Sequence, residues 1–302
     1  MQGSSISNCD VGSVTVKLSD EGTYHITVGC TDMGTGCDTI IAQFAADVLE
    51  TPIDNISVYG VDTDISPYDS GSYASSTTYL TGMAAVKACE QLRERIIALA
   101  AVRMNKDASA LTFDGENVID ESDGAKMSLF DIATASMCNN EISLEVTYSH
   151  SSPVSPPPFM AACAEIEADP ETGAIELLDY TACVDCGTVV NTNLARVQTE
   201  GGLLQGIGMT LYEDIWYDER GKNLSNSFMQ YKVPSRLDTD RIRVEFDSSY
   251  EPTGPFGAKS IGEIVINTPA PAIADAVYNA TGVWINELPI TPEKILKGMK
   301  VI

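Results

Sequence analysis

Hydrophobic and polar residues follow two different periods along this chain, and these periods predict interspersed strands and helices. The run VTVKLSDEGTYHITV, residues 14–28, holds two β-rich stretches around the turn signal Asp20-Glu21-Gly22, which predicts a hairpin. In the next segment, DMGTGCDTIIAQFAADVLE, the apolar residues of 40–49 return every three to four positions. That period predicts a helix with one buried face.

The same two periods predict the remaining elements. Further strands are expected at 56–61, around 110–119, on either side of a turn at 169–173, and at RIRVEFDSS. Further helices are expected at about 78–104, 128–137, 192–212 and 270–281, with a capped helix start at TPEKILKGM. The predicted buried face of the long helix consists of Ala85, Cys89, Leu92, Ile96 and Leu99. The pattern as a whole predicts an α+β fold with mixed sheets and packed helices.

A proline-rich connection lies near the middle of the chain, at Pro153 and at Pro156, Pro157 and Pro158. Such a sequence is typical of an extended link between compact parts. We therefore expect two α/β subdomains, at residues 1–150 and 151–302.

The composition is that of a globular protein with an acidic surface. Of 302 residues, 44% are hydrophobic and 20% are charged, and the formal net charge is −25. This charge repels polyanions, which argues against DNA or RNA as the main partner. The sequence has no apolar run of about 18 residues that would span a membrane, and its N-terminus lacks the features of a signal peptide. Because lysines and arginines are few, an anionic ligand would have to be held largely by backbone amides and hydroxyl groups.

The chain contains eight cysteines and two histidines. Without a secretion signal, the cysteines are expected to be reduced thiols, which indicates a cytoplasmic protein. Cys183 and Cys186 form the only C-x-x-C pair, and one pair does not complete a four-ligand zinc or iron–sulfur site. We therefore expect buried thiols at this pair and no metal ion ligated by protein side chains.

Two loops ahead of predicted helices are candidates for anion binding. Residues 72–78 precede the long helix, whose first amide groups and positive dipole end would face an anion. Gly34-Thr35-Gly36 precedes the helix at 37–49, and its glycines permit positive φ and a close approach to a ligand. Taken alone, each loop also fits an ordinary helix cap or a common glycine turn.

Two further polar residues lie among glycines. Gln205 lies in GGLLQGIGM, where helical glycines cost about 1 kcal/mol each relative to alanine and so indicate close packing. Glu263 ends the loop GPFGAKSIGE, just before an apolar run. A carboxylate there is expected to lose contact with water, which favours its neutral form and suits a general base. The alternatives are a glutamine at the edge of a tightly packed helix and a solvated loop glutamate.

These segments together resemble the xanthine dehydrogenase and aldehyde oxidase family. GAKSIGE, PAPAIADAVYNATGV and ELPITPEKIL are similar to the C-terminal signature of the family's large subunit. DMGTGCDTIIAQFAADVL, DTDISPYDSGSYASSTTYLTG and VDCGTVVNTNLARVQTEGGLLQGIGM resemble its second molybdopterin-binding region. The resemblance covers essentially the whole chain, in the order of the family.

The resemblance implies a cofactor and a reaction. The cofactor is molybdenum held by the dithiolene of a molybdopterin, expected as the cytosine dinucleotide, so protein side chains would not ligate the metal. Glu263 is implied as the general base of a hydroxylation whose oxygen comes from water. Cofactor contacts are implied for Gly34, Thr35, Gly36, Ser72, Tyr73, Ala74, Ser75, Thr77, Gln205 and Lys259. Thr35 stands where many relatives have glutamine, so only its backbone contact is expected.

The family's large subunits are more than twice as long as this chain, and their upstream half is missing here. A split gene, a fragment, or a gene model that begins at an internal methionine would each explain the difference. The expected partners are the other half of the molybdenum subunit, a 2Fe-2S iron–sulfur subunit and an FAD subunit. We expect the chain to be inactive without them.

We predict a component of a molybdenum hydroxylase that acts on a small heteroaromatic substrate, a purine such as xanthine. Nicotinate or aldehyde hydroxylation stays open, because substrate residues lie largely in the absent half. Two hypotheses of a different class are a non-catalytic binding or chaperone-like member of the family and an unrelated acidic binding protein. The joint presence of Glu263, Gln205 and the loop at 72–77 argues against a loss of the chemistry.

Overall fold

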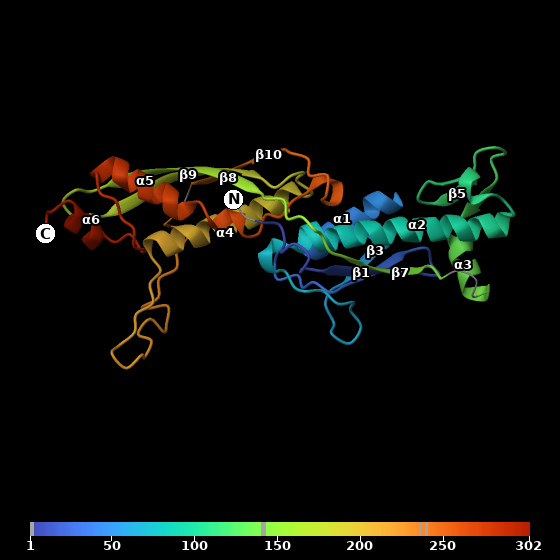
Figure 1. The fold of residues 1–302 in the computed structure, drawn as a ribbon, viewed down its shortest axis with the longest axis horizontal. Helices are drawn as coiled ribbons and strands as arrows, with labels where there is room; N and C mark the ends of the chain where they lie inside the picture. The colour runs from blue at the N-terminus through green and yellow to red at the C-terminus, as the bar shows by residue number, and fades with distance from the viewer. Residues whose placement is uncertain (1–2, 140–142, 236, 239–240) are drawn as a thin grey trace. The chain divides into compact units, whose positions relative to one another are not determined.

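The computed structural model of this chain describes residues 3–139, 143–235, 237–238 and 241–302 (Figure 1). Its backbone contacts divide the chain into two compact units. We call residues 3–156 together with Tyr250–Ser260 the amino unit, and residues 157–249 together with Ile261–Ile302 the carboxyl unit. The sequence predicted one division, after residue 150, and gave no sign that Tyr250–Ser260 returns to the amino unit.

A four-stranded sheet with the order β3-β2-β1-β7 forms the base of the amino unit. Its strands are β1 (Gly12–Leu18), β2 (Tyr24–Val28), β3 (Ile56–Tyr59) and β7 (Glu145–His150). β1 pairs antiparallel with β2, which confirms the predicted hairpin, and also with β7, which no sequence pattern predicted. β3 lies parallel to β2. Residues Val14, Val16 and Leu18 of β1 alternate toward the core and are buried.

Two helices, α1 (Cys37–Leu49) and α2 (Gly82–Met104), pack on this sheet (Figure 1). The predicted buried face of α2 is confirmed, because all five of its residues are at most 1% exposed. The predicted start near residue 78 falls in the first helical turn, which is π-helical and runs directly into the α-helix. The α-helix begins at Gly82, and a π-helical turn at Thr77–Thr81 precedes it. A small antiparallel sheet and a helix complete the unit: β4 (Leu111–Phe113), β5 (Asn117–Asp120), β6 (Lys126–Ser128) and α3 (Leu129–Asn139).

The carboxyl unit is built on a three-stranded mixed sheet with the order β10-β9-β8. Its elements are β8 (Phe159–Ala168), β9 (Ile175–Asp185), α4 (Thr192–Leu211), β10 (Ile242–Asp247), α5 (Pro269–Thr281) and α6 (Pro292–Gly298). β8 and β9 are antiparallel around the predicted turn at 169–173, whereas β10 runs parallel to β9. The predicted cap of the last helix is confirmed, since the Thr291 hydroxyl accepts a hydrogen bond from the Lys294 amide at 3.3 Å. The mixed α/β fold class is therefore confirmed.

The C-x-x-C pair differs from the prediction at one of its two residues. Cys186 is buried in a small cluster with Val184, Ile264 and Val265, as expected. Cys183 is exposed, because alternate residues of β9 point to opposite faces and only the face of Val184 is covered. The seven cysteines whose side chains the structure describes are all free thiols. Among the described helices, none combines the length and apolarity that a membrane crossing requires.

Close packing explains the costly glycines of α4. A Cβ atom on Gly202 would lie 2.1 Å from Cγ2 of Val265, and one on Gly206 would lie 2.5 Å from Cγ of Pro269. Such contacts leave no room for a methyl group, so α4 approaches the segment after residue 263 more closely than alanine permits. The packing predicted from GGLLQGIGM is confirmed.

We predict that Gly202→Ala lowers the free energy of unfolding by about 1–3 kcal/mol, because the new methyl group overlaps the buried Val265. Gly201→Ala is the matched control, since a Cβ there meets nothing within 4 Å. The control is expected to raise stability by about 0.5–1 kcal/mol through helix propensity. Urea unfolding of both variants measures the difference, and equal stabilities would contradict the packing argument.

Candidate functional site

The loop at 72–77 enters α2 through two irregular turns. A 3-10 turn spans Tyr73–Ser75 and is followed by the π-helical turn at Thr77–Thr81. Within it, Ala74 and Ser75 have φ values of 51° and 58°, a left-handed conformation that non-glycine residues rarely adopt. Each such residue costs on the order of 1–3 kcal/mol and tends to persist at ligand sites. Adjacent left-handed and right-handed residues also turn successive amide groups toward one side, as anion-binding nests do.

The donors of this loop are neutral. The Thr77 hydroxyl donates a hydrogen bond to the Ser72 hydroxyl at 3.0 Å, and both side chains are half-buried. The Ser76 hydroxyl is buried and donates to the Gly71 carbonyl, so it fixes the loop itself. Tyr73 is 46% exposed, and hydrogen bonding to Asp10 raises the pKa of its hydroxyl, which therefore stays protonated. With the first amides of the helix, this set suits an anionic ligand that carries further polar groups.

The loop at Gly34-Thr35-Gly36 is arranged differently from the prediction. Gly34 and Gly36 do have positive φ, at 102° and 74°. Their amides, however, donate hydrogen bonds to Oδ1 of Asp32 at 2.9 and 3.0 Å, so these two donors are already engaged within the chain. Although partial burial acts in the opposite direction, these bonds hold the pKa of Asp32 below its usual value. An aspartate two residues before a glycine is a known signal for this turn, and the sequence interpretation overlooked it.

Lys259 belongs to the amino unit, together with the loop at 72–77. The segment that carries it is fastened to the π-helical turn before α2, where the Tyr79 hydroxyl bonds to Oγ1 of Thr253 at 2.7 Å. The next residue, Ser260, donates its amide to the Ser4 hydroxyl at 3.1 Å. Lys259 is only 7% exposed, which is unusual for a lysine.

Gln205 and Glu263 belong to the carboxyl unit and lie on two segments that pack together. Glu263 directly precedes a 3-10 turn at Ile264–Ile266, whose residues Ile264 and Val265 are 1% exposed. Because Val265 fits against Gly202 of α4, the turn after Glu263 rests on the helix that carries Gln205.

Both side chains are exposed on this unit, so the expected desolvation of Glu263 is wrong for the chain by itself. The cause is local: the two apolar residues that follow turn inward and leave Glu263 outside.

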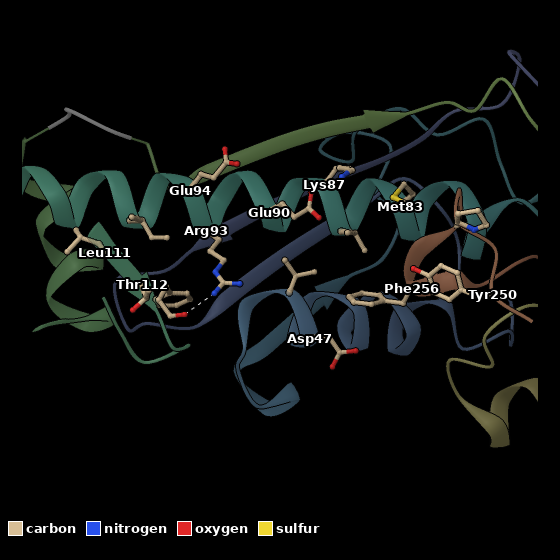
Figure 2. Close-up of a pocket in the computed structure, with 16 residues that line it drawn as sticks. Asp47, Met83, Lys87, Glu90, Arg93, Glu94, Leu111, Thr112, Tyr250 and Phe256 are labelled. Carbon is tan, nitrogen blue, oxygen red and sulfur yellow. Dashed lines mark hydrogen bonds and ion pairs between the residues drawn. The ribbon is translucent and has the colours of Figure 1, made fainter. Parts of the chain in front are cut away.

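A groove with a volume of about 750 Å³ follows α2 in the amino unit (Figure 2). In it, Arg93 donates to the Phe113 carbonyl at 2.9 Å and pairs with Glu50 at 2.6 Å, so its charge is compensated. The exposed Phe256 lies at the other end and stacks on Phe44, with ring centroids 5.9 Å apart. None of the predicted site residues lines this groove, which therefore is not the predicted cofactor site.

Comparisons with known proteins agree on one family. The family model described as a molybdopterin cofactor-binding domain matches residues 1–240. The probable hypoxanthine oxidase XdhD of Escherichia coli (strain K12) is 38% identical over 304 residues, which cover 100% of this chain and 32% of that protein. The gamma subunit of the 6-hydroxypseudooxynicotine dehydrogenase complex of Paenarthrobacter nicotinovorans is 32% identical over 289 residues, covering 93% of this chain and 36% of that subunit.

A solved structure shares the fold. The crystal structure of quinoline 2-oxidoreductase from Pseudomonas putida 86 superposes with a TM-score of 0.88 at 27% sequence identity, covering 96% of this chain and 38% of that one. This chain thus spans about a third of the length of the relatives that it matches.

We predict that Asp32→Ala accelerates hydrogen exchange of the Gly34 and Gly36 amides by about tenfold or more, because each loses a hydrogen bond to a carboxylate. In the unaltered chain, the lowered pKa of Asp32 means that protection persists somewhat below pH 4 and disappears as the pH falls further. NMR hydrogen exchange measures both effects. Asp54→Ala removes an exposed carboxylate elsewhere and is the control; unchanged exchange in Asp32→Ala would contradict the assignment.

Proposed function

We propose, on the premise that this chain belongs to the molybdopterin cofactor-binding family, that it holds the pterin of a molybdenum hydroxylase and supplies its catalytic base. One observation carries the proposal: the loop at 72–77 presents hydroxyls and nest-like amides, with two strained left-handed residues, at the entrance of α2. A chain with 18 basic and 43 acidic residues has few cations for an anionic pterin, so neutral donors fit this ligand well.

The residues divide into two roles. Ser72, Ser75 and Thr77 would bind the pterin and its phosphates through hydroxyls and amides, with Tyr73 and Ala74 shaping the loop. The ammonium group of Lys259 and the side-chain amide of Gln205 would add two further contacts. The Thr35 amide, like those of Gly34 and Gly36, bonds to Asp32, so this loop would contribute less than the sequence predicted. The bound cofactor would supply the two-electron redox chemistry and the transfer of oxygen.

Glu263 would accept the proton that the hydroxylation releases. Its carboxylate is exposed on the carboxyl unit, so this chain alone does not keep water from it. We infer that another part of a large subunit, or a partner chain, covers Glu263 and completes a dry site. The relatives are about three times as long as this chain, which supports this inference. Iron–sulfur and FAD subunits, and the cytosine dinucleotide form of the pterin, belong to the same proposal.

The proposed substrate is a purine, hydroxylated at a ring carbon with oxygen from water. The 38% identity to a probable hypoxanthine oxidase supports this choice. The 32% identity to a 6-hydroxypseudooxynicotine dehydrogenase subunit favours a second candidate, another nitrogen heteroaromatic such as nicotinate. Aldehyde oxidation is a third candidate. Initial rates of the assembled complex with xanthine, hypoxanthine, nicotinate and an aromatic aldehyde separate these candidates.

We predict that Glu263→Gln in the assembled complex lowers turnover by about 10²–10⁴-fold, because the carboxamide keeps the shape but accepts no proton. Molybdenum and pterin contents are expected to stay unchanged, since Glu263 is not proposed to hold the cofactor. Glu287→Gln, an exposed glutamate of the same unit, is the matched control. Turnover near that of the unaltered complex would remove Glu263 from the role of base.

A further inference from the structure

Three side chains that can ligate a metal ion come together around the Gly34–Gly36 loop, and the thiol of Cys30 lies beside them. The ligating atoms of Asp32, Cys37 and Asp38 all lie within 4.8 Å of one another. The buried thiol of Cys30 interacts with Cys37 and lies next to this group of three without belonging to it. We call Cys30, Asp32, Cys37 and Asp38 the thiol–carboxylate cluster.

The local backbone explains why these residues meet. Gly36 adopts a left-handed conformation that ends the loop and starts α1, so Cys37 and Asp38 are the first two residues of the helix. The bonds from the Gly34 and Gly36 amides fold Asp32 back toward them. The backbone amides of Thr35 and Asp38 also hydrogen-bond to Asp32, so groups of the loop and of the first turn of α1 hold its carboxylate in place.

Burial separates this cluster from an ordinary group of surface acids. Cys30 is 1% exposed and Cys37 is 6% exposed, so two sulfur atoms lie at the inner side of the group. Asp38 is half-buried, with an oxygen near the position that a Cβ on Gly60 would take, at 3.5 Å. Buried carboxylates and thiols are stable when they are hydrogen-bonded, protonated or bound to a metal ion.

The cluster also lacks a positive partner in the described part of the chain. The contacts of its four members there are with amides, with one another and with nearby acids, and include no lysine, arginine or histidine. In a chain of net charge −25, such a group attracts a cation. Magnesium and calcium prefer oxygen ligands alone, whereas zinc accepts both thiolate sulfur and carboxylate oxygen.

We propose that Asp32, Cys37 and Asp38, with Cys30 in the fourth position, bind one zinc ion that fixes the Gly34–Gly36 loop to the start of α1. Tetrahedral zinc, with bonds of about 2.0–2.3 Å, places its ligands roughly 3.3–3.8 Å apart. The ligating atoms of Asp32, Cys37 and Asp38, now within 4.8 Å of one another, would have to draw closer, and the Cys30 side chain would have to turn toward them. The amides on Asp32 would act as the outer hydrogen bonds that orient a ligating carboxylate. This ion would be structural and separate from the molybdenum cofactor, and the proposal does not depend on that cofactor.

The test uses the purified full chain, reduced and stripped of metals, with Co²⁺ as the spectroscopic substitute for zinc. One Co²⁺ per chain is expected to bind, with a thiolate-to-cobalt charge-transfer band that an equivalent of Zn²⁺ abolishes. Cys37→Ser should remove the band and weaken Co²⁺ binding by about 100-fold or more, and Cys30→Ser should reduce the band and weaken binding less. Asp38→Asn, which changes a half-buried side chain without changing its size, should weaken binding by at least about tenfold.

Cys9→Ser and Asp54→Asn, which remove an exposed thiol and an exposed carboxylate outside the cluster, are the controls and should bind as the unaltered chain does. Circular dichroism shows whether each variant is folded. Absence of the charge-transfer band in the unaltered chain, or its persistence in folded Cys37→Ser, would overturn the proposal. So would Co²⁺ binding in Asp38→Asn as tight as in the unaltered chain. Since none of these readouts involves molybdenum or turnover, their failure would leave the proposed function untouched.

Discussion

A chain that is short of positive side chains would have to hold an anion with neutral donors, and the proposed function places this constraint on the amino unit. Hydroxyls and helix-start amides are the donors available at the loop at 72–77. The backbone here is irregular, because Ala74 and Ser75 occupy left-handed conformations and a π-helical turn precedes α2. Under the proposed function, this irregularity would direct the donors toward one ligand. The rigid packing of α1 and α2 on the sheet supplies the stability that offsets this local strain.

In the carboxyl unit, close packing positions the segment that carries Glu263, the proposed base. The glycines of α4 remove side chains where Val265 and Pro269 approach, so the helix and the segment after Glu263 touch through backbone and apolar atoms. A contact of this kind leaves little freedom for the turn at Ile264–Ile266. Glu263 therefore directly precedes a turn whose position is fixed by packing. Its side chain is exposed to solvent, whereas a general base is more effective where water is excluded.

The two glycine-containing loops show how similar sequence features lead to different donor sets. At Gly34–Gly36, the carboxylate of Asp32 accepts hydrogen bonds from two amides of the same loop. The chain itself therefore occupies these two donors. At 72–77, the buried Ser76 hydroxyl stabilises the loop by donating a hydrogen bond to the Gly71 carbonyl. This bond uses no backbone amide of the loop. The hydrogen bonds from the loop amides favour the charged form of Asp32. Its negative charge lies beside the first turn of α1 and contributes to the negative potential of the thiol–carboxylate cluster.

The sequence by itself determined the local elements. The hairpin, the buried face of α2, the cap at Thr291 and the tight glycines of α4 each follow from spacings of a few residues, and the segments that resemble the family identify it. Tertiary structure alone decided the pairing of β1 with β7, the return of Tyr250–Ser260 to the amino unit, and the exposure of Cys183 and Glu263. The strand pairing and the returning segment depend on which surfaces meet across more than a hundred residues, whereas the two exposures depend on which face of β9 and of the turn after Glu263 the fold covers. Periodicity shows which side of an element is apolar, but only the assembled fold shows what covers it.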